Sequence, residues 1–206
     1  MTALLRQLND ELAALVDRAR PSLVQIHNGR RGAGAGTIIH EDGLIVTNAH
    51  VVRGRSPRVT LWDGRELPGR LLGHDERHDL AAVSVSAAAL PTLPLANGRE
   101  LRAGQWVIAL GHPWGVRGAT TAGMVISVGR PIEKLPFDGD LIQVGLHLRP
   151  GHSGGPMLDD RGRLVGINTM IAGPNVGLAV PIPTVKRFLK QILGSSVQRQ
   201  PQPAYV

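Results

Sequence analysis

Ser153 lies in a short turn that begins after Pro150 and ends before Pro156. The two prolines fix the backbone on either side of the turn, and Gly151 and Gly154 give it freedom that other residues lack. Such a turn can direct the N–H groups of Gly151 and Ser153 at one point beside the Ser153 hydroxyl. A nucleophile with two fixed donors is the arrangement that acyl transfer needs. The stretch predicts an acyl-transfer site; a hairpin turn with an incidental serine is the alternative.

A serine hydroxyl is a weak nucleophile and needs a neighbouring base, and that base needs a third group to orient it. Among the eight histidines, His50 ends an apolar stretch that begins at Leu44 and is followed by two valines. We expect a strand over this stretch, with the His50 ring directed into a cleft. His27 and His40 lie beside turn signals, and His112 is expected in a surface loop. A lone histidine is more often structural than catalytic.

Asp79 is the candidate for the third group. It opens the apolar run that follows it, so its carboxylate is expected to be buried at the edge of a strand. Asp75 is the rival, but its charged neighbours place it in a polar loop. His74 and His78 have the spacing of metal ligands, yet the string between them lacks the zinc-protease pattern, and we expect no metal site and no cofactor.

Composition excludes several classes of protein. The chain has 206 residues with 42% hydrophobic, 26 glycines, 15 prolines and no cysteine, which is typical of a turn-rich globular protein and excludes disulfides and thiolate chemistry. Its net charge of +7 comes mainly from scattered arginines, so no nucleic-acid partner is expected. No apolar run reaches the roughly 18 residues of a membrane span. The N-terminus lacks the features of a secretory signal, and with Met1 as the native start a cytoplasmic location is expected.

The elements that must position these residues follow from the periodicity. An amphipathic helix is expected over residues 1–20, because its apolar residues recur at helical spacing; this stripe docks on the body of the chain or on another subunit. Short strands with turn signals then predict an all-β sandwich or barrel. A crossing near 87–103 contains Pro91 and Pro94 and separates two halves. A second helix over 183–193 is expected to end at Gly194, and residues 194–206 are expected to form a flexible tail.

Three motifs carry a resemblance to a known family. The segments 47–52, 78–81 and 150–156 contain His50, Asp79 and Ser153, and they resemble the three catalytic motifs of the HtrA (Deg) branch of the trypsin-like serine proteases. The similarity runs from about Ser22 to Leu193.

The resemblance implies two six-stranded β-barrels, with residues 21–193 as the protease domain and the triad in the cleft between the barrels. His50 would act as the base, Asp79 would orient it, and Ser153 would attack the substrate. The backbone around Gly151, His152 and Ser153 would form the oxyanion hole. The implied activity is a serine endopeptidase; the alternative is a resting or inactive peptide-binding, chaperone-like module of the same fold.

The implied substrate is an unfolded or extended polypeptide, cleaved with a preference for aliphatic residues at P1, the residue before the scissile bond. By the resemblance, residues 167–170 would pair with the substrate backbone, and the apolar residues near the expected pocket favour the aliphatic preference. The expected substrate-binding residues are Leu146, His147, Leu148, Ile167, Asn168, Thr169 and Met170.

The sequence departs from the family pattern at several points. His152 stands where the family usually has asparagine, and residues 144–147 replace a more polar stretch. No chain follows Leu193 for the PDZ domain that many members carry, so only the protease domain is expected. A homo-oligomer, a trimer in many members, is implied by the resemblance, but the N-terminal aromatic residues that form such trimers are absent.

Overall fold

A computed structural model of the chain describes residues 3–27, 33–97, 101–131 and 137–197. Twelve strands in these ranges form two closed, six-stranded barrels, which confirms the expected fold class. The first barrel contains β1 (Leu23–His27), β2 (Ala33–His40), β3 (Leu44–Thr47), β4 (Arg58–Thr60), β5 (Glu66–Asp75) and β6 (Leu80–Val85). The second contains β7 (Trp106–Gly111), β8 (Ala119–Gly129), β9 (Leu141–Gly145), β10 (Pro156–Leu158), β11 (Leu164–Ile171) and β12 (Val176–Pro181).

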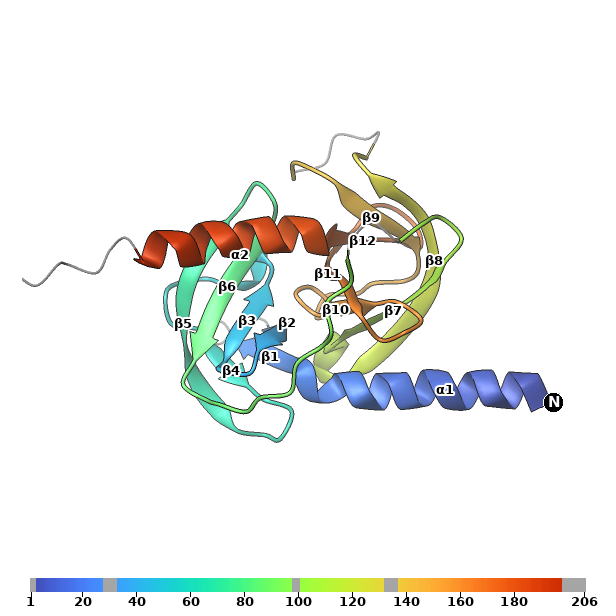
Figure 1. Cartoon of the computed structure of the whole chain (residues 1–206), viewed down its shortest axis with the longest axis horizontal. Coiled ribbons are helices and arrows are strands. Elements are labelled where there is room, and N and C mark those ends of the chain that lie inside the picture. The colour runs from blue at the N-terminus through green and yellow to red at the C-terminus, as the bar shows by residue number, and fades with distance from the viewer. Residues whose placement is uncertain (1–2, 28–32, 98–100, 132–136, 198–206) are drawn as a thin grey trace, which may run out of the picture.

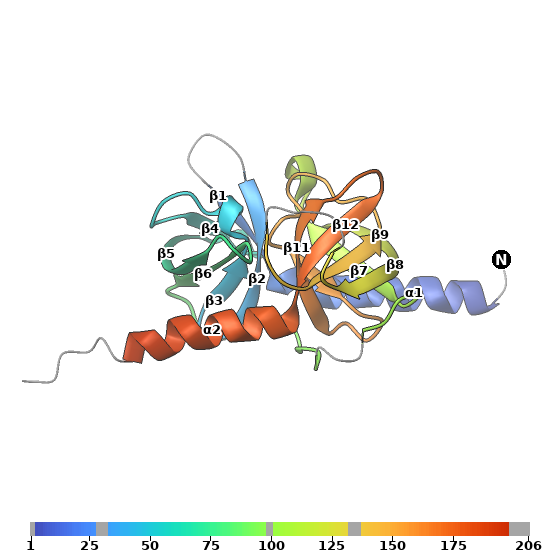
Figure 2. The same ribbon diagram turned by 90° about the horizontal axis from the view of Figure 1, so that it is seen from above.

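The two barrels lie side by side and share one plan (Figures 1 and 2). In the first, neighbouring strands follow the order β1, β2, β3, β6, β5, β4, and β4 closes the barrel on β1. In the second, the corresponding order is β7, β8, β9, β12, β11, β10, and β10 closes the barrel on β7. All of these strand pairs are antiparallel. Closure leaves no long unpaired edge among the strands that the structure describes.

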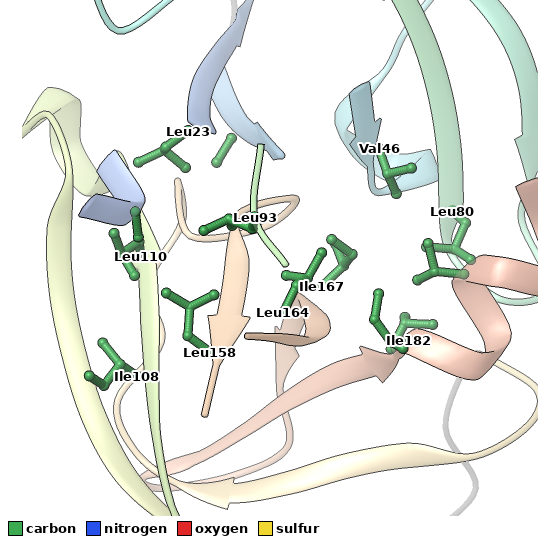
Figure 3. Close-up of a cluster of buried hydrophobic side chains, with 14 of the residues drawn as sticks. Leu23, Val46, Leu80, Leu93, Ile108, Leu110, Leu158, Leu164, Ile167 and Ile182 are labelled. Atoms are coloured by element: carbon green, nitrogen blue, oxygen red, sulfur yellow. The ribbon is translucent and has the colours of Figure 1, made fainter. Parts of the chain in front are cut away.

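Three apolar clusters hold the fold together. One fills the first barrel and a second fills the other barrel. The third lies between them and joins residues of both barrels to the ends of the two helices, as Figure 3 shows for Val46 and Leu80 beside Ile167 and Ile182. Because the barrels share this buried layer, each one holds its half of the cleft in register with the other.

The helices pack differently. The helix α2 (Ile182–Val197) runs along the first barrel and packs on β5 and β6, and Ile192 lies against the backbone of Gly73 (Figure 1). The helix α1 (Ala3–Ala19) passes the second barrel and projects beyond it. Only Leu15, Val16 and Ala19 of α1 are buried. None of the helices within the described ranges is long and apolar enough to cross a membrane.

Several boundaries differ from expectation. The stripe of α1 docks on the body of this chain only at its C-terminal end, because the leucines at 4, 5, 8 and 12 are 37–73% exposed. The helix α2 continues through Gly194 to Val197, since a glycine weakens a helix without ending it. The crossing between barrels is fixed to β11 by hydrogen bonds that join Pro94 and Ala96 to Leu164. Residues 198–206 of the expected tail lie outside the described residues.

Candidate functional site

The pairing of β3 with β6 brings His50 beside Asp79. These strands are antiparallel and Thr47 pairs with Ala81, so the C-terminal end of β3 lies next to the N-terminal end of β6. The expected strand over 44–52 was wrong at its end: β3 stops at Thr47, and residues 49–51 form a short 3₁₀ turn. The turn directs the His50 backbone N–H at the Asp79 carboxylate, at 3.1 Å.

The Asp79 carboxylate accepts several hydrogen bonds at once. His50 Nδ1 lies 2.9 Å from each of its oxygens, and Thr169 donates its hydroxyl to Oδ2. Asp79 is only 1% exposed, and its backbone adopts a positive φ of 52°. Asn48 donates its side-chain amide to the Asp79 carbonyl and holds this unusual conformation. The buried carboxylate is therefore fixed in both position and orientation.

The contact with Asp79 sets the tautomer of His50. An ionised carboxylate only accepts hydrogen bonds, so His50 Nδ1 carries the proton and Nε2 keeps its lone pair. The His50 side chain is 47% exposed, whereas its partner is buried. One ring nitrogen is thus held by the protein and the other is left to act as a base.

Ser153 is held from the first barrel although it belongs to the second. Its carbonyl accepts the N–H of Ala35 at 2.8 Å, and Thr37 donates its hydroxyl to the next carbonyl, that of Gly154. Gly154 has φ of +86°, and a Cβ there would lie 2.0 Å from the Ala35 carbonyl oxygen. The close approach of β2 therefore requires glycine after the serine.

Ser153 and His50 line one cavity of about 260 Å³, together with Thr169 and apolar side chains of the second barrel. The Ser153 hydroxyl donates to the Thr169 carbonyl at 2.7 Å. Among the described residues, no hydrogen bond joins this hydroxyl to His50. A second cavity, of about 200 Å³, is lined by none of the predicted site residues.

The turn before Ser153 has the geometry of a type II turn. The His152 N–H donates to the Arg149 carbonyl at 2.9 Å, and Gly151, third in the turn, has φ of +105°. A type II turn requires positive φ at this position, and its central peptide is reversed relative to that of a type I turn. A Cβ on Gly151 would lie 2.5 Å from the His112 carbonyl oxygen, so only glycine is accommodated there. Within the described part of the chain, neither the Gly151 nor the Ser153 N–H donates to another backbone group.

The structure brings only some of the expected substrate-binding residues to the cavity. Leu148, Thr169 and Met170 line it, and so do Arg149 and Ile171, which sequence reasoning missed.

Four other expected substrate-binding residues lie elsewhere. Ile167 and Asn168 are fully buried, and Asn168 donates to the carbonyls of Leu110 and Pro156. Leu146 is buried against Gly177, and His147 is exposed and bonded to Asn175. Ile167 and Asn168 are consecutive on β11, so their side chains point to opposite faces of the strand, and both faces are buried. Leu146 belongs to the apolar cluster inside the second barrel.

The remaining histidines have structural partners. His112 was expected in a surface loop, but it is 5% exposed, because its loop folds back against the turn of residues 149–152, where the His112 N–H donates to the Gly151 carbonyl. Burial lowers the pKa of His112 to about 4, so it stays neutral near physiological pH. His78 Nδ1 lies 2.7 Å from Asp75, and His74 contacts the Ala49 carbonyl.

Comparisons with known proteins identify the family of the chain. The trypsin-like peptidase domain family matches residues 34–167. A relative from Halomonas elongata, described as "Probable periplasmic serine endoprotease DegP-like", is 42% identical over 75% of this chain and 33% of its own length. A relative of the same description from Brucella suis is 38% identical over 93% of this chain and 38% of its own length. The chain therefore spans between about a third and about two fifths of the length of the curated relatives that it matches.

A solved structure described as "HtrA-type protease AlgW with tripeptide" superimposes with a TM-score of 0.84 and 31% identity, covering 89% of this chain and 64% of the other. The family match covers more than half of the chain, and the fold and the relatives agree with it. The chain belongs to the trypsin-like peptidase family and has the protease fold of its HtrA/DegP-like members.

Proposed function

We propose that this chain is a serine endopeptidase in which Ser153 is the nucleophile, His50 the general base and Asp79 the orienting carboxylate. The observation that carries the proposal is the buried Asp79 carboxylate, 2.9 Å from His50 Nδ1, at a cavity that His50 shares with Ser153. The relatives described as serine endoproteases support the reaction class.

The proposed reaction has two half-reactions. The Ser153 hydroxyl oxygen attacks the substrate carbonyl carbon, and its proton passes to His50 Nε2. The tetrahedral intermediate then expels the amine, which takes that proton from His50, and an acyl-enzyme remains. A water molecule attacks the acyl-enzyme in the same way, with His50 again accepting a proton and returning it to Ser153. The Gly151 and Ser153 N–H groups stabilise the oxyanion in both steps.

Before the first step the Ser153 side chain must rotate. Its hydroxyl donates to the Thr169 carbonyl, so attack requires a turn about χ1 toward His50. Such a rotamer change in a partly exposed side chain is fast compared with enzymatic turnover. The hydrogen bond to Thr169 also favours the second candidate function, a peptide-binding module with an idle serine. The type II turn at Gly151 favours the enzyme, because it leaves two backbone donors available.

The C-terminal part of β11 supports an extended peptide as the substrate. The β11 strand pairs with β10 as far as Ile167, and beyond this point Met170 and Ile171 line the cavity. An extended peptide can add there as a further strand. Leu148, Met170 and Ile171 are apolar, so we propose an aliphatic residue before the scissile bond. The AlgW structure described with a tripeptide supports a peptide ligand for this fold.

Cleavage of unfolded casein tests the proposal. Ser153→Ala should lower the rate by about 10⁴-fold or more, because loss of the nucleophile removes the covalent step. The matched control is Ser86→Ala, which changes an exposed serine away from the cavity and should leave the rate unchanged. Mass spectrometry of the products should place most cuts after aliphatic residues. Equal rates for the wild type and Ser153→Ala would refute the nucleophile, and cuts after charged residues would refute the specificity.

A further inference from the structure

His152 is buried beside the nucleophile and binds both backbone groups of one residue. Its ring Nδ1 lies 3.1 Å from the Arg149 amide nitrogen and 3.2 Å from the Arg149 carbonyl oxygen, and that carbonyl also accepts the His152 N–H at 2.9 Å. The residue is only 3% exposed, and its ring lies against Gly111, where a Cβ would come 3.1 Å from His152 Cδ2. The ring is therefore closely packed behind the turn of residues 149–152, which we call the oxyanion turn because it carries the Gly151 N–H.

These bonds fasten the start of the turn to its end. Gly151, between them, has no side chain to limit its backbone, so its conformation depends on its neighbours. The Gly151 carbonyl is held by the N–H of His112 at 2.8 Å, and the Arg149 guanidinium lies over the Trp114 ring at 4.5 Å. The His152 ring adds a side-chain restraint at the Arg149 amide.

The Arg149 carbonyl already accepts the His152 N–H, whereas the Arg149 N–H has no other acceptor among the described residues, so a neutral, accepting Nδ1 satisfies both groups. A backbone N–H always donates, so Nδ1 accepts only when it carries no proton. Burial has the largest effect and lowers the pKa of His152; the Arg149 carbonyl acts the other way, and the charges of Arg149 and His147 lower the pKa further. His112, on the neighbouring loop, also faces this region and has a pKa lowered to about 4, so it carries no charge near physiological pH. His152 Nε2 is buried and has no partner among the described residues, so a charged ring gains no stabilising contact there.

We propose that the neutral His152 imidazole is a positioning residue that holds the oxyanion turn in its type II form, and that its protonation releases the Arg149 amide and slows acylation. The proposal rests on the serine endopeptidase function above. His152 touches no reacting atom and acts through the direction of the Gly151 N–H. Its loss should therefore lower kcat and leave KM nearly unchanged.

Steady-state kinetics on a short peptide from pH 5 to 9 test this role. His152→Ala should lower kcat by about 10- to 100-fold, less than the 10²–10³-fold cost of removing an oxyanion donor outright. His152→Asn should restore most of the rate, because its side-chain oxygen accepts the same amide without titrating. The acid limb of its kcat profile should also lose one ionisation. The exposed His40 provides the matched control, and His40→Asn should behave as wild type.

Histidine side-chain ¹⁵N spectra of the inactive Ser153→Ala protein give a readout that needs no turnover. They should show His152 with an unprotonated Nδ1 at neutral pH, and a protonated Nδ1 there would overturn the proposal. So would an unchanged kcat in His152→Ala, or the wild-type acid limb in His152→Asn, when the wild type is active. An inactive wild type would refute the endopeptidase function itself, and this inference would fall with it. Circular dichroism of each variant separates loss of fold from loss of position.

Discussion

The buried His112 ring makes the stability of the folded chain depend on pH. Its pKa is lowered to about 4 by burial, whereas an exposed histidine titrates near 6.5. As pH falls through 6.5, the unfolded chain takes up a proton that the folded chain refuses until about pH 4. This residue should therefore reduce the free energy of unfolding progressively across that window, by on the order of 2–3 kcal/mol in total.

The variant His112→Asn tests this assignment. Urea unfolding at pH 7.5 and at pH 4.5 should show a smaller loss of stability on acidification in the variant than in the wild type. His40→Asn, which removes an exposed histidine, should retain the wild-type loss. Identical acid sensitivity in His112→Asn and the wild type would contradict the burial of a neutral ring.

The sequence indicates which single residues could be catalytic better than it indicates which residues contact them. His50 and Asp79 could be chosen because each borders an apolar run that must form a strand, and the β3–β6 pairing brings those ends together. The role of Thr169 was missed: its hydroxyl reaches Asp79 across 90 residues, and no local pattern records such a contact. The type II turn at Gly151 also depends on packing, here against the backbone of His112.

At the scale of elements, α1 divides into an anchored end and a projecting one. Leu15 is 4% exposed and lies against Gly162 of the second barrel, whereas Leu8 is 52% exposed. Leu15→Ala should lower the free energy of unfolding by about 2–4 kcal/mol, since it removes a buried side chain. Leu8→Ala should change it by less than about 0.5 kcal/mol. Denaturant melts of the two variants check this, and equal losses would mean that the whole stripe packs on the chain.

Helical spacing predicted α1 and α2, but spacing alone does not say what covers an apolar stripe. Four leucines of α1 remain 37–73% exposed, and the helix itself continues past the second barrel (Figure 2). Strand ends were harder to predict than strands. The apolar run from Leu44 to Val52 continues beyond β3, yet the hydrogen bonds of Asn48 and His50 to Asp79 turn the chain at that point.

At the scale of the whole molecule, the site exists only because two barrels meet. The first barrel supplies His50 and Asp79, and the second supplies Ser153 and Thr169. Bonds from β2 to Ser153 and Gly154 cross the junction, and so does the Arg117 side chain, which donates to the Trp62 carbonyl and lies over the Trp62 ring. The short motifs could be recognised separately in the sequence, but the shared core and these contacts between the barrels set the distance between them.

Reaction with a fluorophosphonate tests the central claim most directly, because this reagent phosphonylates only a serine that a neighbouring base has activated. Intact mass and peptide mapping should show one label per chain, on Ser153, and none on Ser153→Ala. His50→Ala should label far more slowly than the wild type. A wild-type protein that stays unlabelled, or one that carries its label on another residue, would contradict the account.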